Sequence, residues 1–167
     1  MANSEGSRLH NNRWVTEAHP YPLSTTAYAA GDLIGTKMTF PDVIQADYGG
    51  GEITNVTVID KGKQLKALKL LIFEEDLGAN TGVGTTWSTG DNATLRVADS
   101  DAVECAGVIS IGTGDYTSLA DNTIASKSAS LPFYVKGRNL YGLLVSGGTG
   151  SYDSDDIVIK LGIERDN

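Results

Sequence analysis

The side chains that most often carry out acid-base chemistry or bind metals are scarce in this sequence. Histidine occurs twice, at His10 and His19, and both positions lie in a polar N-terminal stretch with no strand end beside them. A Ser-His-Asp triad or a histidine-based zinc site is therefore not expected. Cys105 is the only cysteine and lies in a run that predicts a strand, so we interpret it as a small buried hydrophobic residue. These observations favour a protein that is not an enzyme.

Clustered carboxylates are the remaining candidates for chemistry. Asp153, Asp155 and Asp156 form one group, and Asp99 and Asp101 form another. Such oxygen ligands could bind Ca²⁺ on a loop, but the glycine and the closing glutamate of an EF-hand loop are absent. We interpret both groups as solvated loop carboxylates, and we expect no metal and no cofactor. A carboxylate pair for glycoside hydrolysis stays open as an alternative, although no aromatic cluster accompanies these residues.

Composition limits the remaining classes of function. The 167 residues are enough for one domain, or for one domain with an arm, and the net charge is −8. A negative charge disfavours nucleic acid and anionic membranes as partners. No apolar run approaches the roughly 18 residues of a membrane span, and the first residues lack the apolar core of a secretory signal, so we expect synthesis in a cytoplasm. The 20 glycines against 4 prolines favour a turn-rich all-β fold.

The stretch 49–76 is the centre of the predicted fold. Two β-prone runs are separated by a polar loop that contains glycine, which is typical of a β-hairpin. The apolar positions change phase halfway through the first run, so we predict a β-bulge near Thr54 and Asn55. The second run is apolar on both faces, which favours a place inside a sandwich or beneath a partner subunit. A helix over 64–73 is the alternative, because the same leucines also have helical spacing.

Further runs predict the rest of a β-sandwich. Strands are expected at 33–40, 104–111, 131–135, 140–145 and 156–164. Pro132 near the start of its run indicates an edge strand. A short helix is expected within 91–103, with Asp91 or Asn92 as its cap. The spacing favours an all-β, jelly-roll-like sandwich of seven or eight strands.

The first 26 residues differ from the rest in composition. We predict an extended N-terminal arm over 1–26 and a sandwich domain over 27–167. Trp14, Tyr21 and Leu23 are the candidate residues with which the arm contacts a neighbouring subunit or a partner surface, because aromatic anchors are common in such contacts. A disordered tail is the alternative.

Two long loops, 77–92 and 147–156, carry the other candidate contact residues. These are Trp87 and Tyr152. Long loops in a compact domain are usually functional or disordered. For Trp87, a role as an aromatic plug in the core is also open.

The order of several segments resembles a known family. The segments are Tyr28-Ala-Ala-Gly-Asp-Leu-Ile-Gly35, Gly51-Glu-Ile-Thr, Val58-Ile-Asp60, Leu70-Leu-Ile-Phe73, Gly107-Val-Ile and Leu140-Tyr-Gly-Leu-Leu144. Over roughly residues 28–163 they resemble the capsid decoration, or cement, proteins of tailed bacteriophages. The resemblance implies a non-enzymatic β-sandwich protein on the capsid exterior, bound as a trimer to the major capsid protein so that it ties capsomers together. It supplies no catalytic residues.

We therefore expect a virion structural protein that forms a homotrimer. Apolar strand faces that the core of one monomer leaves uncovered would form the subunit interface. The candidate residues are Leu71, Phe73, Leu140, Leu143 and Val145. The alternative is a carbohydrate- or receptor-binding module of a phage fibre or appendage, with Trp87 and Tyr152 on one rim. Neither hypothesis involves nucleic acid or a membrane.

Overall fold

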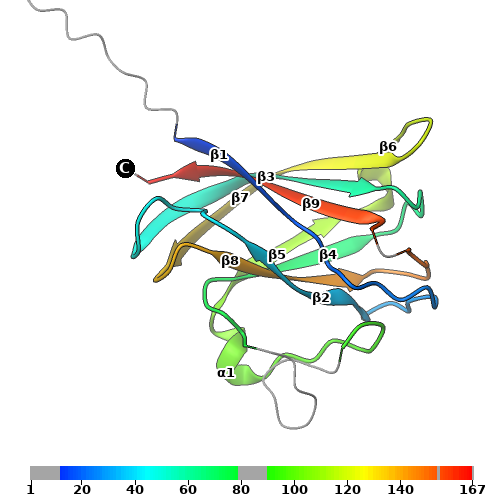
Figure 1. Cartoon of the computed structure of the whole chain (residues 1–167), viewed down its shortest axis with the longest axis horizontal. Coiled ribbons are helices and arrows are strands. Elements are labelled where there is room, and N and C mark those ends of the chain that lie inside the picture. Colours follow the sequence, from blue (N-terminus) through cyan, green and yellow to red (C-terminus); the bar gives the residue numbers. More distant parts are fainter. Residues whose placement is uncertain (1–11, 79–89, 154, 167) are drawn as a thin grey trace, which may run out of the picture.

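The computed structural model describes residues 12–78, 90–153 and 155–166. Its nine strands form two antiparallel sheets that pack as a sandwich, which confirms the predicted all-β sandwich (Figure 1). The five-stranded sheet contains, in spatial order, β1 (Arg13–Ala18), β9 (Ile157–Arg165), β3 (Gly49–Asp60), β7 (Thr123–Val135) and β6 (Tyr116–Ser118). The four-stranded sheet contains β2 (Leu33–Phe40), β8 (Leu140–Ser146), β4 (Leu68–Phe73) and β5 (Cys105–Ile111). The helical turns are α1 (Asp99–Ala102) and η1 (Thr113–Asp115).

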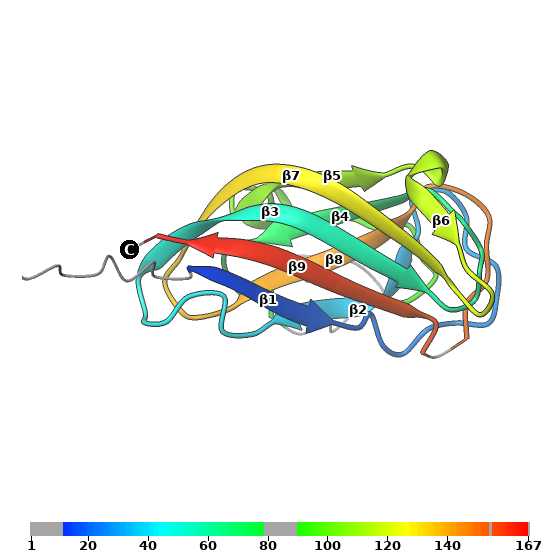
Figure 2. The same cartoon turned by 90° about the horizontal axis from the view of Figure 1, so that it is seen from above.

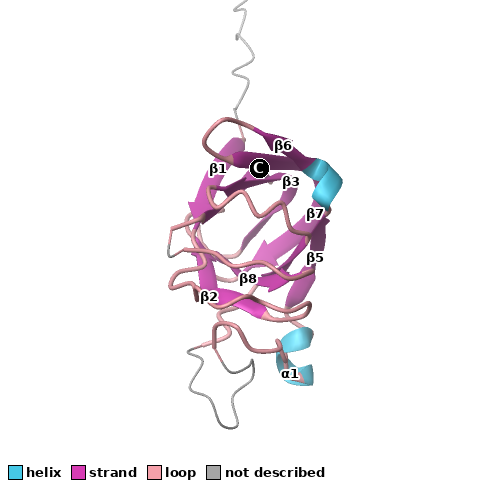
Figure 3. Ribbon diagram, turned by 90° about the vertical axis from the view of Figure 1, so that its right-hand side faces the viewer, coloured by secondary structure: helices cyan, strands magenta, loops and turns pink. Residues whose placement is uncertain are grey.

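The pairing of the strands is nested. β1 pairs with β9, β2 with β8, β3 with β7 and β4 with β5, and consecutive pairs alternate between the two sheets. This is the order of a jelly roll, in which a long folded-back chain wraps around one core. Figure 3 views the two layers along the length of the sandwich.

The predicted hairpin within 49–76 is wrong. β3 pairs with β7 and β9, whereas β4 pairs with β5 and β8, so the link 61–67 crosses from one sheet to the other. Packed sheets lie about 10 Å apart, a distance that a seven-residue link spans easily. The helix alternative over 64–73 is also wrong, because the second run forms β4.

The predicted bulge is confirmed. Both ladders of β3 shift register between Ile53 and Asn55. The extra residue brings Ile53 and Val56 onto the same inner face, where both are fully buried. The bulge therefore corrects the phase of the apolar pattern.

The main core fills the space between the sheets. Its largest fully buried side chains are Tyr28, Ile34, Met38, Phe40, Ile53, Leu68, Leu70, Ile72, Ile111 and Leu140. Among the described residues, no helix is long and apolar enough to cross a membrane.

A second, smaller core lies on the outer face of the four-stranded sheet. Leu33, Phe73, Leu77 and Leu143 are buried there, and Leu95 and Val97 pack against them. The segment that carries Leu95 and Val97 leads to α1 and covers this face (Figure 1). β4 is therefore apolar on both faces because its own chain covers the outer one. The helix expected within 91–103 is limited to the four residues of α1.

Candidate contact surface at the terminal end of the sandwich

We use the name terminal end for the end of the sandwich at which β1 begins and β9 ends (Figure 2). The strand registers bring separate segments together there. Arg13 lies opposite Glu164, Gly51 opposite Arg165, and Gly50 opposite Tyr134. The first residue of β1, the last of β9, the start of β3 and the end of β7 therefore share one surface.

Trp14 is held on this surface by Arg165. The Arg165 guanidinium carbon lies 4.4 Å from the centre of the Trp14 ring, a cation–π arrangement. The Arg165 Nε donates a hydrogen bond of 2.9 Å to the carbonyl of Val43, and another guanidinium nitrogen donates to the carbonyl of Asp42. One arginine thus joins β9, the edge strand β1 and the loop 41–48, and it orients the indole.

Tyr48 projects from the loop before β3. Its backbone φ is 61°, which costs a non-glycine residue about 1–2 kcal/mol, and its amide donates a 3.1 Å hydrogen bond to the carbonyl of Lys136. Strained backbone of this kind persists only where its surroundings hold it, and it is enriched at functional sites. The result is a tyrosine ring that is 71% exposed on a fixed backbone.

Tyr134 adds a third aromatic side chain. It lies on the free edge of β7, and its amide donates a 2.8 Å hydrogen bond to the Glu74 carboxylate instead of to another strand. Of the four aromatic side chains that are clearly exposed in the described part, three lie at the terminal end: Trp14 at 42%, Tyr48 at 71% and Tyr134 at 55%. Trp14 lies on the side of β1 that carries the buried Thr16 and Ala18, and Tyr134 points outward from β7, so the three side chains share one end of the sandwich from different faces. Exposed aromatic residues are common anchors of binding surfaces.

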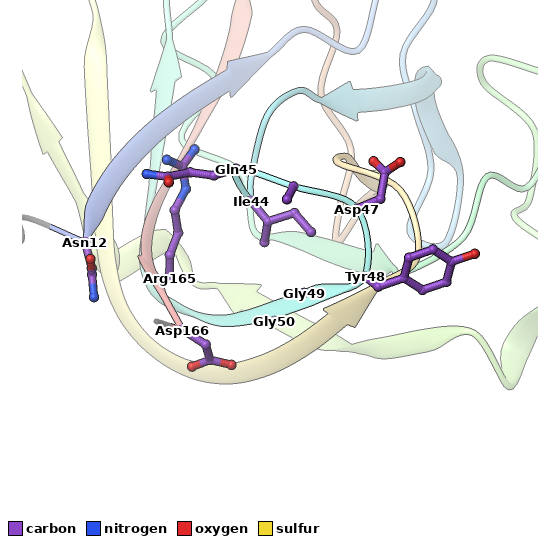
Figure 4. A pocket seen from close by; sticks show the side chains of 10 residues that line it. Asn12, Ile44, Gln45, Asp47, Tyr48, Gly49, Gly50, Arg165 and Asp166 are labelled. Carbon is purple, nitrogen blue, oxygen red and sulfur yellow. The ribbon is translucent and has the colours of Figure 1, made fainter.

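A hollow of about 430 Å³ opens beside Tyr48 (Figure 4). Its walls carry both polar and apolar groups, with Arg165, Asp166 and Asn12 on one side, Ile44 between, and Asp47 and Tyr48 on the other. Gln45, Ala46, Gly49 and Gly50 complete the lining. The hollow offers amide, carboxylate and guanidinium groups next to an aromatic ring, a combination that suits binding.

Among the described residues, none of those considered for chemistry in the sequence lines this hollow. In the ranges that the structure describes, no three His, Cys, Asp or Glu side chains come together as a group that could hold a metal ion. Cys105 is half-buried on β5 and packs against the second core, where burial raises the pKa of its thiol. His19 is exposed, and His10 lies outside the described residues.

The residues predicted for the arm do not act as one unit. Residues 13–18 form β1 and pair with β9, so the sandwich begins within the stretch that was assigned to the arm. Trp14 lies at the terminal end, whereas Tyr21 follows the other end of β1 and is 60% exposed. Leu23 packs against the main core of its own chain. Composition did not reveal β1, because this short edge strand has only one apolar-rich spot.

Most candidates for the subunit interface are corrected by their burial. Phe73, Leu140 and Leu143 have no exposed surface, and Val145 is 8% exposed. Leu140 belongs to the main core, while Phe73 and Leu143 belong to the second core, so these side chains already have partners within the chain. Leu71 is half-buried and lies opposite Val108, and it stays a candidate.

The loop candidates have a different outcome. Tyr152 is 2% exposed and packs against Tyr28, with 6.0 Å between the ring centres, so it is a core residue and the expected rim contact is wrong. Trp87 lies outside the described residues. Sequence reasoning missed Tyr48, Tyr134 and Arg165. Strand alternation places Tyr134 outward and could have indicated it, but no local pattern indicated the other two.

Comparison of the sequence with protein-family models and with curated proteins returned no match. The surface therefore has to be interpreted from its own residues.

Proposed function

We propose that this chain is a non-enzymatic structural protein that decorates a phage capsid and binds between capsomers through the terminal end. The observation that carries the proposal is the gathering of Trp14, Tyr48 and Tyr134 at one end of a sandwich. These side chains come from three separate segments and are held in place by Arg165, by strained backbone and by strand pairing. The capsid as partner rests on the sequence resemblance.

Capsid decoration requires a surface that is complementary to the partner, and it requires no catalytic step. Anchoring aromatic side chains fill pockets of a partner at low cost in conformational entropy. A protein that binds only the assembled shell stabilises it by mass action, and many copies on a lattice gain from effective concentration. The net charge of −8 suits a positively charged partner surface.

Co-sedimentation with purified capsids that lack the chain tests this proposal. The wild-type protein should sediment with the capsids, and Trp14→Ala or Tyr48→Ala should each weaken binding by about tenfold or more. Tyr21→Ala is the matched control, because Tyr21 is a similarly exposed aromatic residue beyond the other end of β1. Equal losses in all three variants would place the contact elsewhere, and no sedimentation of the wild type would refute capsid binding.

A test of the arm requires a deletion that is shorter than the predicted arm, 1–26. Removing residues 1–26 would also remove β1 from the five-stranded sheet. Deletion of residues 1–11 leaves every described strand in place. If the arm contacts the capsid, this deletion weakens co-sedimentation while the circular dichroism spectrum is unchanged.

The proposed trimer would use surface that the monomer leaves exposed. Val108 on β5 is 54% exposed and lies opposite the half-buried Leu71 on the neighbouring strand β4. Val103 is also exposed and lies just before β5 in the sequence. Light scattering after size exclusion should give a trimer that Val108→Glu dissociates. Leu119→Glu is the control, since Leu119 is exposed beyond β6. A monomeric wild type would refute the trimer.

A carbohydrate-binding module is the second candidate. Tyr152 is buried and so does not form the expected rim, and Trp87 lies outside the described residues, but the hollow beside Tyr48 combines an exposed tyrosine with amide and carboxylate groups. A glycan array tests it: binding that is lost in Tyr48→Ala would support this function over capsid decoration.

A further inference from the structure

The end of the sandwich opposite the terminal end contains a buried carboxylate. β3 ends there (Figure 2), and its last residue, Asp60, is 1% exposed and follows the buried positions of that strand. One carboxylate oxygen, Oδ2, accepts a 3.0 Å hydrogen bond from the amide of Leu65. The other oxygen, Oδ1, is buried and has no hydrogen-bond partner among the described residues. An unsatisfied carboxylate oxygen in the interior requires an explanation.

Two tyrosine hydroxyls near Asp60 share this property. The hydroxyl oxygens of Tyr116 and Tyr152 are buried and have no hydrogen-bond partner within the part of the chain that the structure describes. Burial raises the pKa of both hydroxyls, and the negative charge of Asp60 raises it further. Three orphaned polar oxygens are therefore within electrostatic reach of one another.

A second carboxylate faces the same space. The Oδ2 atom of Asp156 lies 2.5 Å, and the Oδ1 atom of Asp60 3.5 Å, from the point that a Cβ atom on Gly62 would occupy. Glycine at position 62 keeps this space open. Asp156 also lines a polar hollow of about 280 Å³ together with Tyr152 and Lys61, which gives the space a route from solvent.

No described lysine, arginine or histidine forms an ion pair with either carboxylate. Lys61 lines the hollow without forming such a pair with Asp60 or Asp156. The ammonium of Lys63 is directed elsewhere, to the carbonyl of Ala120. The Oδ2 atom of Asp156, which is half-buried, accepts a 2.7 Å hydrogen bond from the amide of Asp153. Burying the charge of Asp60 beside a second carboxylate is costly, and a proton or a bound cation would lower that cost.

We propose that Asp60 and Asp156 bind a divalent cation with a preference for oxygen ligands, such as Ca²⁺, and that the hydroxyls of Tyr116 and Tyr152 lie around it. This departs from the expectation of no metal. Ca²⁺ accepts irregular shells of carboxylate, carbonyl and water oxygens, and a site with only two carboxylates belongs to the weak class, with a dissociation constant of about 10⁻⁴–10⁻³ M. Such a cation would satisfy Asp60 and fix the link 61–67 against the start of β9.

Terbium luminescence tests the proposal, because Tb³⁺ replaces Ca²⁺ and is sensitised by nearby tyrosine rings. The metal-free full chain should show tyrosine-sensitised emission on titration with Tb³⁺, and Ca²⁺ should compete it away. Ca²⁺ at ten times its dissociation constant should raise the melting temperature by about 3–6 °C. Asp60→Asn should weaken Ca²⁺ binding by about tenfold or more.

Matched variants keep the test specific. Asp99→Asn makes the same charge change on an exposed residue of α1, outside both hollows, and should leave the emission unchanged. If Asp60→Asn does not fold, Asp156→Asn, at a half-buried position, takes its place. Wild-type protein that shows neither Tb³⁺ emission nor a Ca²⁺-dependent shift would overturn the proposal, and the proton would then be what neutralises Asp60.

Discussion

Replacing Leu143 with alanine should destabilise the single folded chain rather than an assembly. Leu143 has no exposed surface and packs in the second core with Leu33 and Phe73. Truncation of a buried leucine to alanine costs about 2–5 kcal/mol, because transfer energy is lost and a cavity remains. Since this site is covered by the chain's own segment, we expect about 3 kcal/mol, which lowers the melting temperature by about 6–12 °C for a chain of this size.

Urea denaturation followed by circular dichroism measures this change, and light scattering reports the oligomeric state in parallel. Leu119→Ala is the control, because Leu119 is an apolar residue that is 49% exposed beyond the end of β6, away from the proposed trimer surface. It should change the free energy of unfolding by at most about 0.5 kcal/mol. If Leu143→Ala instead dissociates an oligomer and alters the free energy of unfolding by less than about 1 kcal/mol, the second core is not the reason for the burial of Leu143.

Three further predictions concern backbone space, pH and thiol reactivity. Gly35 has a φ of 71°, and a Cβ atom there would lie 1.7 Å from the carbonyl oxygen of Pro20, whereas Gly31, with a φ of 93°, has open space. In denaturant titrations, Gly35→Ala should therefore cost about 1–3 kcal/mol more than Gly31→Ala; equal costs would contradict the clash. Burial raises the pKa of Asp60 above its ordinary value of 3.8, so in metal-free protein its contribution to stability is complete below pH 3.8 and is lost as the pH rises through the folded-state pKa. Unfolding measured across this pH range should show that decline in the wild type and a smaller one in Asp60→Asn. The raised thiol pKa of Cys105 predicts slower alkylation in the native than in the unfolded chain, and equal rates would refute it.

The elements of the fold were largely predictable from local pattern. β-branched and apolar residues that alternate with a period of two indicate a strand wherever they occur, which is why β2, β4, β5, β8 and β9 coincide with predicted runs. A change of phase in that pattern indicated the bulge between Ile53 and Asn55 for the same reason. The scarcity of histidine and cysteine is likewise visible in the sequence alone.

Which strands pair with one another can be known only from the tertiary structure. A β-prone run, a polar loop and a second run have the same local signature whether the strands pair or lie in opposite sheets, and only long-range contacts place β3 beside β7 and β4 beside β5. The outer face of β4 could equally have been covered by a partner subunit, and the segment that carries Leu95 and Val97 covers it instead. Trp14, Tyr48 and Tyr134 are far apart in the chain, and the nested pairing of antiparallel strands brings them to one end. Residue type and spacing thus indicated most of the strands and the scarcity of histidine and cysteine, while surfaces built from several strands exist only after the chain has folded.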